Sequence, residues 1–341
     1  METVATWAQR VKANIETVIF GKGEIIDRLL VALLCRGHVL LEDVPGVGKT
    51  ILARAMAASL GCTMQRIQCT PDLMPSDVLG TSVYNQRTGD FEFRDGPVVT
   101  NLLLVDEINR ATPRTQSALL EAMEERALTI EGERRPLPDP FIVLATENPI
   151  EFEGTFPLPE AQKDRFFLAT RMGYPTEEAE IAIMESQRRM SHPVEDLTAV
   201  TDAATVRAMQ EAAARVAVDE AAIDYILRLV GITRGDGRLA LGASPRASRT
   251  LYRGAQARAA LAGRAAAERS DVAALAPAVL WKRIVVRPEQ AFRGITEELA
   301  IAGLLAEAEG GGGPDKLGGP DVRNGPNGVG GAAAREGAEQ R

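Results

Sequence analysis

The chain has 341 residues, of which 45% are hydrophobic and 25% charged. This suits an ordinary globular protein of about two domains, at roughly 150 residues each. A formal charge of -8 disfavours a protein that coats nucleic acid or anionic membranes. No apolar run approaches the ~18 residues that span a bilayer, so we expect a cytoplasmic protein without membrane insertion. Cys35, Cys62 and Cys69 lack metal-binding spacing, and we expect buried thiols.

The first half of the chain alternates helical and strand-like segments. Helical patterns cover residues 2–18 and 24–36, and Gly37 is placed to end the second helix as a C-terminal glycine. Short apolar runs then recur between further helical segments: "HVLLE", "CTMQRIQC", "NLLLVDE", "PFIVLATEN" and "FFLATRM". Such runs are typical of buried parallel strands. We therefore predict an α/β domain over residues 1–172, with a five-stranded parallel sheet.

Two hairpins are predicted inside this domain. The segment "GTSVYNQRTGDFEFRDG" alternates apolar and polar residues on both sides of "RTGD", and "ALTIEGERRPL" is predicted to turn at residues 131–133. Hairpins inserted between core elements are rarely needed by the core. We therefore expect both hairpins to reach toward another molecule.

The second half of the chain has a different character. From residue 173 to residue 308 the strand signals vanish, and the pattern predicts a small all-helical domain. Residues 309–341 are rich in Gly, Pro and Asn and have almost nothing to bury, so we predict a disordered tail.

The stretch "HVLLEDVPGVGKT", at residues 38–50, reads as a strand that enters a phosphate-binding loop, and a helix that ends near Gly61 follows it. In such a loop, backbone N–H groups surround the β-phosphate, Lys49 neutralises the β and γ oxygens, and Thr50 binds Mg²⁺. The alternative is a chance G-x-G-K-T at a helix start. The residues expected at the nucleotide are Pro45, Gly46, Val47, Gly48, Lys49, Thr50 and Ile51.

Asp43 stands where the familiar loop pattern has its first glycine. Asp tolerates left-handed backbone values at modest cost, so the loop can still turn sharply there. The amides that cradle phosphate come later, from about Gly46. We predict a working variant in which Asp43 points away from the phosphates, because a second negative charge beside them would oppose ATP.

Polar side chains follow two further predicted strands. Asp106 and Glu107 end "NLLLVDE", where Asp106 would bind Mg²⁺ and Glu107 would orient and polarise the attacking water. The alternative is a pair of carboxylates that cap the helix starting near Pro113. Asn148 ends "FIVLATEN" and would position the water or touch the γ-phosphate, although Asn-Pro alone is only a turn signal.

The order of Lys49, Asp106-Glu107 and Asn148, followed by "LPEAQKDRF" and "GASPRA", resembles the MoxR family of AAA+ ATPases. The resemblance extends to about residue 305 and is most specific in "CTPDLMPSDVLG", "VDEINRATPRTQSALLEAMEE" and "ATENPIEFEGTFPLPEAQKDRF". It implies an αβα sandwich of AAA+ type with a helical lid domain. The hairpins at residues 81–94 and 127–137 match the insert of the helix-2-insert clade and the insert before sensor 1.

The same resemblance implies roles for single residues. Asn148 matches sensor 1, Arg165 the arginine finger that reaches a neighbouring subunit's γ-phosphate, and Arg246 sensor 2. The stretch from Ile19 to Gly21 matches the lining of the adenine pocket.

The residues give independent support to two of these roles. Ser244 is a good N-cap and Pro245 a good first helical residue, so Arg246 would sit at a rigid helix start. Arg165 follows a short predicted helix at the rim of the domain. The alternative for each arginine is a local surface salt bridge, and two other arginines are candidates for action across an interface, namely Arg110 and Arg114.

What the resemblance implies is an ATP-hydrolysing motor that uses ATP and Mg²⁺ and remodels or activates a protein client. ATP would bind between the α/β domain and the helical lid domain. A site shared with a neighbour needs a homo-oligomer, and the family suggests a hexamer. Clients in the family include metal-dependent enzymes and proteins with a von Willebrand factor A domain.

Three alternatives stay open at this point. A metal-chelatase-type motor subunit has similar parts, and a nucleotide-gated scaffold would bind ATP without turnover. A nucleic-acid-remodelling ATPase is disfavoured by the net negative charge. The arginines between residues 228 and 269 lack interleaved aromatic residues, so they are a weak signal for nucleic acid.

Overall fold

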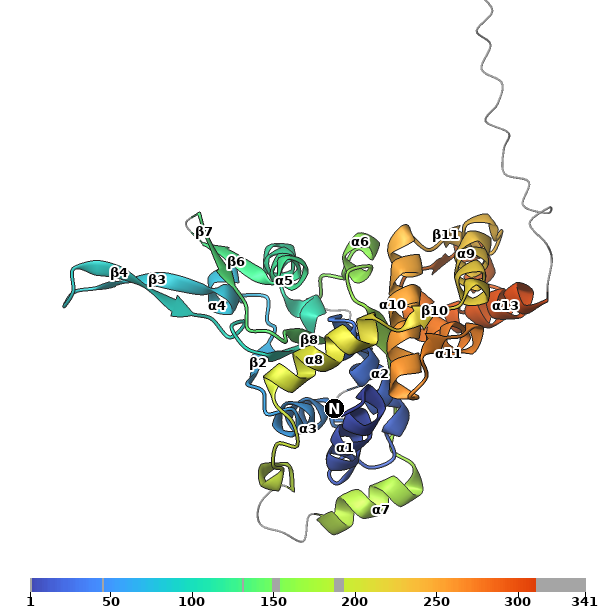
Figure 1. Cartoon of the computed structure of the whole chain (residues 1–341). Helices are drawn as coiled ribbons and strands as arrows, with labels where there is room; N and C mark the ends of the chain where they lie inside the picture. The colour runs from blue at the N-terminus through green and yellow to red at the C-terminus, as the bar shows by residue number, and fades with distance from the viewer. Residues whose placement is uncertain (1, 45, 131, 149–153, 187–192, 311–341) are drawn as a thin grey trace, which may run out of the picture.

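Five parallel strands form the central sheet of the computed structural model, which describes residues 2–44, 46–130, 132–148, 154–186 and 193–310 (Figure 1). The strand order is β2-β5-β8-β1-β9, and all four pairings are parallel. The predicted five-stranded parallel sheet is therefore confirmed. Its strands are β1 (Val39–Glu42), β2 (Met64–Gln68), β5 (Leu102–Asp106), β8 (Ile142–Glu147) and β9 (Leu168–Thr170).

Burial explains why these runs read as apolar. Every residue of β1, β5 and β9 is buried, whereas the edge strand β2 is mostly exposed. A parallel sheet covered on both faces needs apolar residues at successive positions, because side chains point alternately to the two faces. The helices that accompany the sheet are α1 (Val4–Glu16), α2 (Gly23–Leu34), α3 (Lys49–Ser59), α4 (Pro75–Leu79), η1 (Ile108–Arg110), α5 (Pro113–Glu125) and α6 (Glu160–Lys163).

The end of α2 differs from the prediction. Arg36, and not Gly37, takes the left-handed conformation that closes the helix, with φ of 56°. Gly37 is required for another reason, because a Cβ there would lie 2.3 Å from the Cβ of Phe167. Gly37 thus allows the segment before β1 to pass close to Phe167, just before β9. The turn that ends α2 is made by Arg36.

Two hairpins project from one side of the sheet (Figure 1). The first pairs β3 (Gly80–Asn85) with β4 (Asp90–Asp95), and the second pairs β6 (Ala127–Ile130) with β7 (Glu133–Pro136). Residue 131 of the second predicted turn lies outside the described residues. The guanidinium carbon of Arg135 sits 4.5 Å from the ring centre of Phe93, so a cation–π contact joins the two hairpins.

The chain from residue 177 onward is mainly helical, and α10 packs against α2, α9 and α11. The predicted helical character is confirmed, and two short ladders accompany the helices. One pairs β10 (Ala217–Val218) with β12 (Ala266–Ala267), and the other pairs β11 (Leu239–Leu241) with β13 (Val285–Val286). Bridges of two or three residues leave no usable periodicity. The helices are α7 (Glu177–Ser186), η2 (Pro193–Asp196), α8 (Ala203–Ala214), α9 (Glu220–Gly235), α10 (Pro245–Leu261), α11 (Arg269–Leu280), α12 (Pro288–Ala291) and α13 (Glu297–Glu309).

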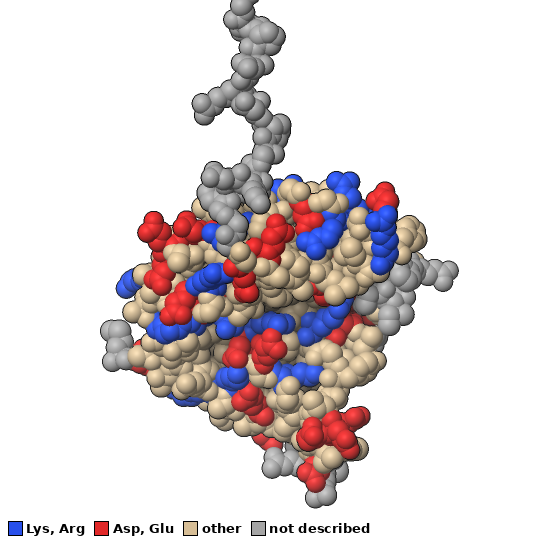
Figure 2. Space-filling model, turned by 90° about the vertical axis from the view of Figure 1, so that its right-hand side faces the viewer, with Lys and Arg blue, Asp and Glu red and all other residues tan. Residues whose placement is uncertain are grey.

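The face formed by the later helices carries acidic and basic side chains side by side (Figure 2). This mixture differs from the continuous basic surface that nucleic-acid binding requires. Among the helices within the described ranges, none is long and apolar enough to cross a bilayer. The predicted disordered tail lies outside the described residues from position 311 onward.

Candidate functional site

The loop between β1 and α3 forms an open cradle at the carboxyl end of the sheet. Gly46 and Gly48 have φ values of 86° and 93°, and a Cβ added at either would meet nothing within 4 Å. Gly48 is the N-cap of α3, so the first N–H groups of that helix point toward the cradle. Exposed N–H groups at a helix start beside open space are the arrangement that binds phosphate. Pro45 lies outside the described residues.

A pocket of about 230 Å³ continues from this cradle. Five of the expected nucleotide residues line it, together with apolar side chains from other segments. Gly21 has φ of 69° and packs against α7, where an added Cβ would lie 3.2 Å from the Cβ of Ala179. An apolar pocket beside a phosphate cradle suits a purine base. The predicted lining residues are Ile19, Gly46, Val47, Gly48 and Ile51, and the additional ones include Val18, Phe20, Met172, Pro175 and Ile183.

Lys49 and Thr50 occupy the first turn of α3. The Lys49 ammonium donates to the carbonyl oxygen of Asp43 over 3.0 Å. Burial lowers the pKa of Lys49, while the charges of Asp43, Asp106 and Glu107 oppose that shift. The charges of the strand-end pair therefore act on the lysine, although it follows a different strand.

Asp106 and Glu107 lie beside the cradle at the end of β5. The Asp106 carboxylate accepts from Arg66 Nε at 2.6 Å and from Thr146 Oγ1 at 3.4 Å. The helix that follows is capped by Thr112, whose hydroxyl accepts from the Thr115 N–H. The alternative that the carboxylates cap this helix was therefore wrong.

Glu107 is held in a strained backbone conformation, with φ of 56°. Its N–H donates to Thr146 Oγ1 at 2.8 Å. Its carboxylate accepts from Gln68 Nε2 at 2.8 Å and from Arg110 at 3.1 Å. Left-handed values are uncommon outside glycine, and such strain gathers at functional sites. Arg110, considered above for action across an interface, here pairs with the glutamate of its own chain.

Asn148 follows β8, the strand next to β5, and is 5% exposed. Its carbonyl oxygen accepts from the Asn109 side-chain amide at 3.5 Å. The parallel sheet thus brings the ends of β1, β5 and β8 to one edge, and with them Lys49, the Asp106-Glu107 pair and Asn148. This convergence is what parallel topology predicts from separate stretches of sequence.

Asp43 points away from the cradle, as its charge led us to expect. Its carboxylate accepts from the backbone N–H of Met172 and, at 3.0 Å, from that of Gly173. From the other side, Lys22 Nζ donates to the carbonyl oxygens of Met172 and Gly173, at 2.6 and 3.1 Å. Asp43 is not among the described residues with positive φ, so the loop does not use the tolerance of aspartate for left-handed values. The aspartate instead ties the start of the loop to the segment that follows β9.

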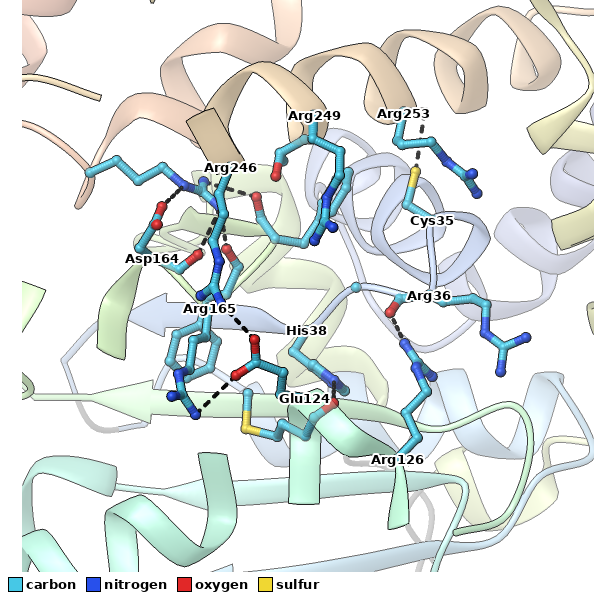
Figure 3. Close-up of a pocket in the computed structure, with 16 residues that line it drawn as sticks. Cys35, Arg36, His38, Glu124, Arg126, Asp164, Arg165, Arg246, Arg249 and Arg253 are labelled. Carbon is cyan, nitrogen blue, oxygen red and sulfur yellow. Dashed lines mark hydrogen bonds and ion pairs between the residues drawn. The ribbon is translucent and has the colours of Figure 1, made fainter. Parts of the chain in front are cut away.

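Arg165 and Arg246 meet in a second pocket, of about 410 Å³, which we call the arginine pocket (Figure 3). Both bind the carboxylate of Glu124: Arg246 Nη2 contacts Oε1 at 2.6 Å, and Arg165 Nη1 contacts Oε2 at 3.2 Å. The predicted helix start is present, since Ser244 Oγ caps α10 by accepting from the Arg246 N–H at 3.1 Å. Arg114 lies elsewhere, in a pocket with Thr112.

The arginine pocket and the cradle lie at opposite ends of β1. Residues 36–38, which precede β1, line the arginine pocket, whereas the cradle follows the strand. A strand of four residues is about 13 Å long at ~3.3 Å per residue. The two arginines are therefore separated from the cradle of their own chain by the length of the strands. In addition, α10 does not line the cradle pocket.

Several polar partners of the site residues, at the cradle and in the arginine pocket, were not predicted from the sequence. Arg66 and Gln68 are two residues apart on β2 and so share one face, where they contact Asp106 at the end of β5 and Glu107 just after it. This spacing could have identified the partners of the two carboxylates, but only once β2 and β5 are known to be neighbours. Glu124 lies on α5 and was given no role from the sequence.

Residues 38–168 match the "ATPase family associated with various cellular activities (AAA)", and residues 232–302 match the "AAA lid domain". Together with the sheet order and the cradle, these matches define an AAA ATPase. The chain is 47% identical over 293 residues to YeaC of Bacillus subtilis (strain 168), covering 86% of this chain and 91% of YeaC.

Chaperone MoxR1 of Mycobacterium tuberculosis is 42% identical over 306 residues, with 87% of this chain and 80% of MoxR1 covered. The crystal structure of a protein from Cytophaga hutchinsonii superposes with a TM-score of 0.84 at 36% identity, covering 89% of this chain and 94% of that one. The chain belongs to the MoxR family of AAA ATPases.

Proposed function

We propose that the protein hydrolyses ATP in a ring-shaped homo-oligomer, with six subunits as the expected number, and uses the cycle to remodel or activate a protein client. The observation that carries the proposal is the division of the catalytic groups between two ends of one strand. The cradle, Asp106 and Glu107 lie at one end of β1, and Arg165 and Arg246 lie at the other. A second subunit that places its arginine pocket against this cradle completes the set.

Each group at the cradle has a role that its position supports. The N–H groups of α3 and the Lys49 ammonium bind the β- and γ-phosphates. Thr50 and Asp106 fit Mg²⁺, since a buried carboxylate and a hydroxyl beside a phosphate cradle are the oxygen donors it takes, and the ion would neutralise phosphate charge. Glu107 accepts a proton from the attacking water, and Asn148 orients that water.

The arginines act on the phosphates of the adjacent subunit. Arg246 sits at a capped helix start, and Arg165 is tied to the same carboxylate, so both cations are held in place before a ligand arrives. A planar guanidinium stabilises the charge that develops on the transferred phosphoryl group, and such a residue contributes about 10³-fold or more in rate. Residues 1–172 are the nucleotide-binding domain in this proposal, and residues 173–308 are the lid.

Client contact is assigned to the two hairpins. They project together from the sheet (Figure 1), and the first exposes Tyr84 and Phe91, which are 52% and 71% accessible. Large exposed aromatic side chains on a projecting element favour contact with another protein. The name of MoxR1 describes that relative as a chaperone, and a chaperone-like action on a metalloenzyme or a protein with a von Willebrand factor A domain is the role we propose here.

Phosphate release by the purified protein tests the hydrolase assignment. Lys49→Ala should abolish turnover through loss of nucleotide, and Glu107→Gln should reduce it by about 10²-fold or more while ATP binding persists. Glu211→Gln, an exposed glutamate of α8, is the matched control and should leave turnover unchanged. Unchanged phosphate release in both site variants would show that the protein is not this kind of ATPase.

The Glu107→Gln variant, which is expected to hydrolyse ATP slowly, also serves to identify the client. Glu107→Gln protein loaded with ATP should retain a client that the wild type releases, because hydrolysis is what ends the bound state. A pull-down from cell extract, compared with Lys49→Ala protein that cannot hold ATP, identifies it. Equal recovery of every protein on both variants would argue against ATP-dependent client binding.

A further inference from the structure

One face of α10 carries three arginines into the arginine pocket. Arg246, Arg249 and Arg253 are spaced three and four residues apart, and all three line the pocket (Figure 3). Residues at this spacing lie on the same side of a helix, with successive members about 5 Å apart along the axis. The sequence motif assigned a role only to the first of them.

The charge of the pocket is unbalanced. Its lining holds seven arginines but only two carboxylates, in a chain whose formal charge is -8. Asp164 is already occupied by Arg283 and Ser244, and Glu124 by Arg165 and Arg246. Arg36 pairs with Asp139 outside the lining, and the excess of cations that remains favours an anion from outside the chain.

Arg249 is the arginine most available to such an anion. Within the described part of the chain, its side chain forms no hydrogen bond or ion pair, and it is exposed at the pocket. Glu124 shows where the anion would fit: one planar group with two oxygens bridges Arg165 and Arg246, as an oxyanion of a phosphate would. Arg249 lies one turn along α10 from that position.

We propose that Arg249 is a third phosphate-binding residue, which contacts the nucleotide held by the neighbouring subunit beside the phosphate that Arg165 and Arg246 engage. This inference rests on the proposed function, because the nucleotide belongs to the adjacent cradle. A polyphosphate presents successive anionic groups along a line, and the row of arginines on α10 presents successive cations along a line. A bidentate guanidinium recognises such oxygens better than an ammonium does.

Mixed oligomers distinguish contact of Arg249 with the neighbour's nucleotide from any effect of Arg249 on the cradle of its own chain. Wild-type protein is mixed with an excess of Lys49→Ala subunits, so that all turnover comes from wild-type cradles facing variant arginine pockets. When the excess subunits carry Lys49→Ala and Arg249→Ala together, KM for ATP should rise about tenfold, the value of one lost charge-assisted hydrogen bond. Partners with Lys49→Ala and Arg215→Ala, an arginine that follows α8 as its C-cap and is 80% exposed, are the control.

The outcomes are distinct. Equal KM with the Arg249→Ala and Arg215→Ala partners, at equal oligomer size by light scattering, overturns the role of Arg249. Failure of Lys49→Ala alone to lower turnover would instead contradict the proposed function. If Arg249→Ala impairs assembly, Arg249→Lys is used in its place: it keeps the charge but loses the fork, so an assembled mixture with raised KM supports the proposal and one with wild-type KM contradicts it.

Discussion

At the scale of the residue, Asp43 shows how a departure from a motif can be read. The aspartate replaces a glycine that elsewhere allows a turn, yet its carboxylate accepts two backbone N–H groups from residues 172 and 173. Those amides come just after the last strand of the sheet, and no helix or ladder pairs them. The side chain therefore satisfies buried donors that would otherwise lack a partner.

We predict that restoring the glycine weakens the protein. Asp43→Gly removes an acceptor of two buried N–H groups and should lower the free energy of unfolding by about 2 kcal/mol. Asp43→Asn keeps one acceptor oxygen and should lose about half as much. Urea unfolding followed by circular dichroism measures both. A glycine variant as stable as the wild type would mean that the contacts with Met172 and Gly173 contribute nothing.

Glu42, the neighbour of Asp43, gives a prediction on pH. Burial would raise its pKa, but hydrogen bonds from Lys282 and Arg171 overcome that effect and hold the pKa below its ordinary value of 4.5. A lowered pKa stabilises the fold above the ordinary value, and this stabilisation is lost as pH falls below 4.5.

Glu42→Gln should therefore lower stability at pH 7 by about 1–2 kcal/mol, since it leaves two cations without their buried partner, and flatten the decline below pH 4.5. The control is Glu298→Gln, which removes a half-exposed partner of the same Arg171 and should cost less than ~0.5 kcal/mol. Melting temperatures from pH 7 to pH 4 provide the comparison. Parallel pH curves for Glu42→Gln and wild type would contradict the assignment.

Much of the arrangement at the cradle was predictable residue by residue, because Lys49 begins the helix after one apolar strand, Asp106 ends a second and Asn148 follows a third. The polar groups that hold them were not predicted. Arg66 contacts Asp106 only because β2 and β5 are neighbours, a pairing between segments about 40 residues apart. Strand order is a property of the whole sheet, so periodicity within one segment cannot reveal such partners.

At the scale of the element, the strands were more predictable than the details of their ends. Each of the five short runs corresponds to a strand. Four of them are largely buried, and burial on both faces leaves a continuous apolar composition, whereas β2 at the edge is mostly exposed. The closing residue of α2 was assigned to Gly37 when Arg36 takes that conformation, since the contact with Phe167 that requires the glycine is tertiary. The ladders of β10 to β13 are too short to have a period.

The two hairpins give a prediction at this scale. Arg135→Ala removes the cation–π contact with Phe93 and should uncouple the hairpins by about 0.5–1 kcal/mol. Faster hydrogen exchange at the amides of β3 and β4 would report the change. Arg134→Ala is the matched control, because this adjacent side chain pairs with Glu125 instead. Equal exchange in the two variants would show that the hairpins do not support each other.

At the scale of the whole molecule, the prediction concerns complementation. Arg165→Ala subunits have intact cradles, and Lys49→Ala subunits have intact arginine pockets. Neither should hydrolyse ATP alone, but mixing them should restore part of the wild-type rate, with a maximum at intermediate ratios. Steady-state phosphate release across a series of ratios measures it. No recovery at any ratio would contradict a site that two subunits share.

The position of β1 has a consequence for the timing of the cycle. This strand leads into the cradle at one end and follows the arginine pocket at the other, and it is buried and paired on both sides by β8 and β9. Sliding of a strand held in this way would break its pairing and packing, so displacement at either end should carry the neighbouring strands with it. In the proposed ring, each sheet would then link two consecutive nucleotides. We accordingly expect neighbouring subunits to hydrolyse ATP in sequence and not independently.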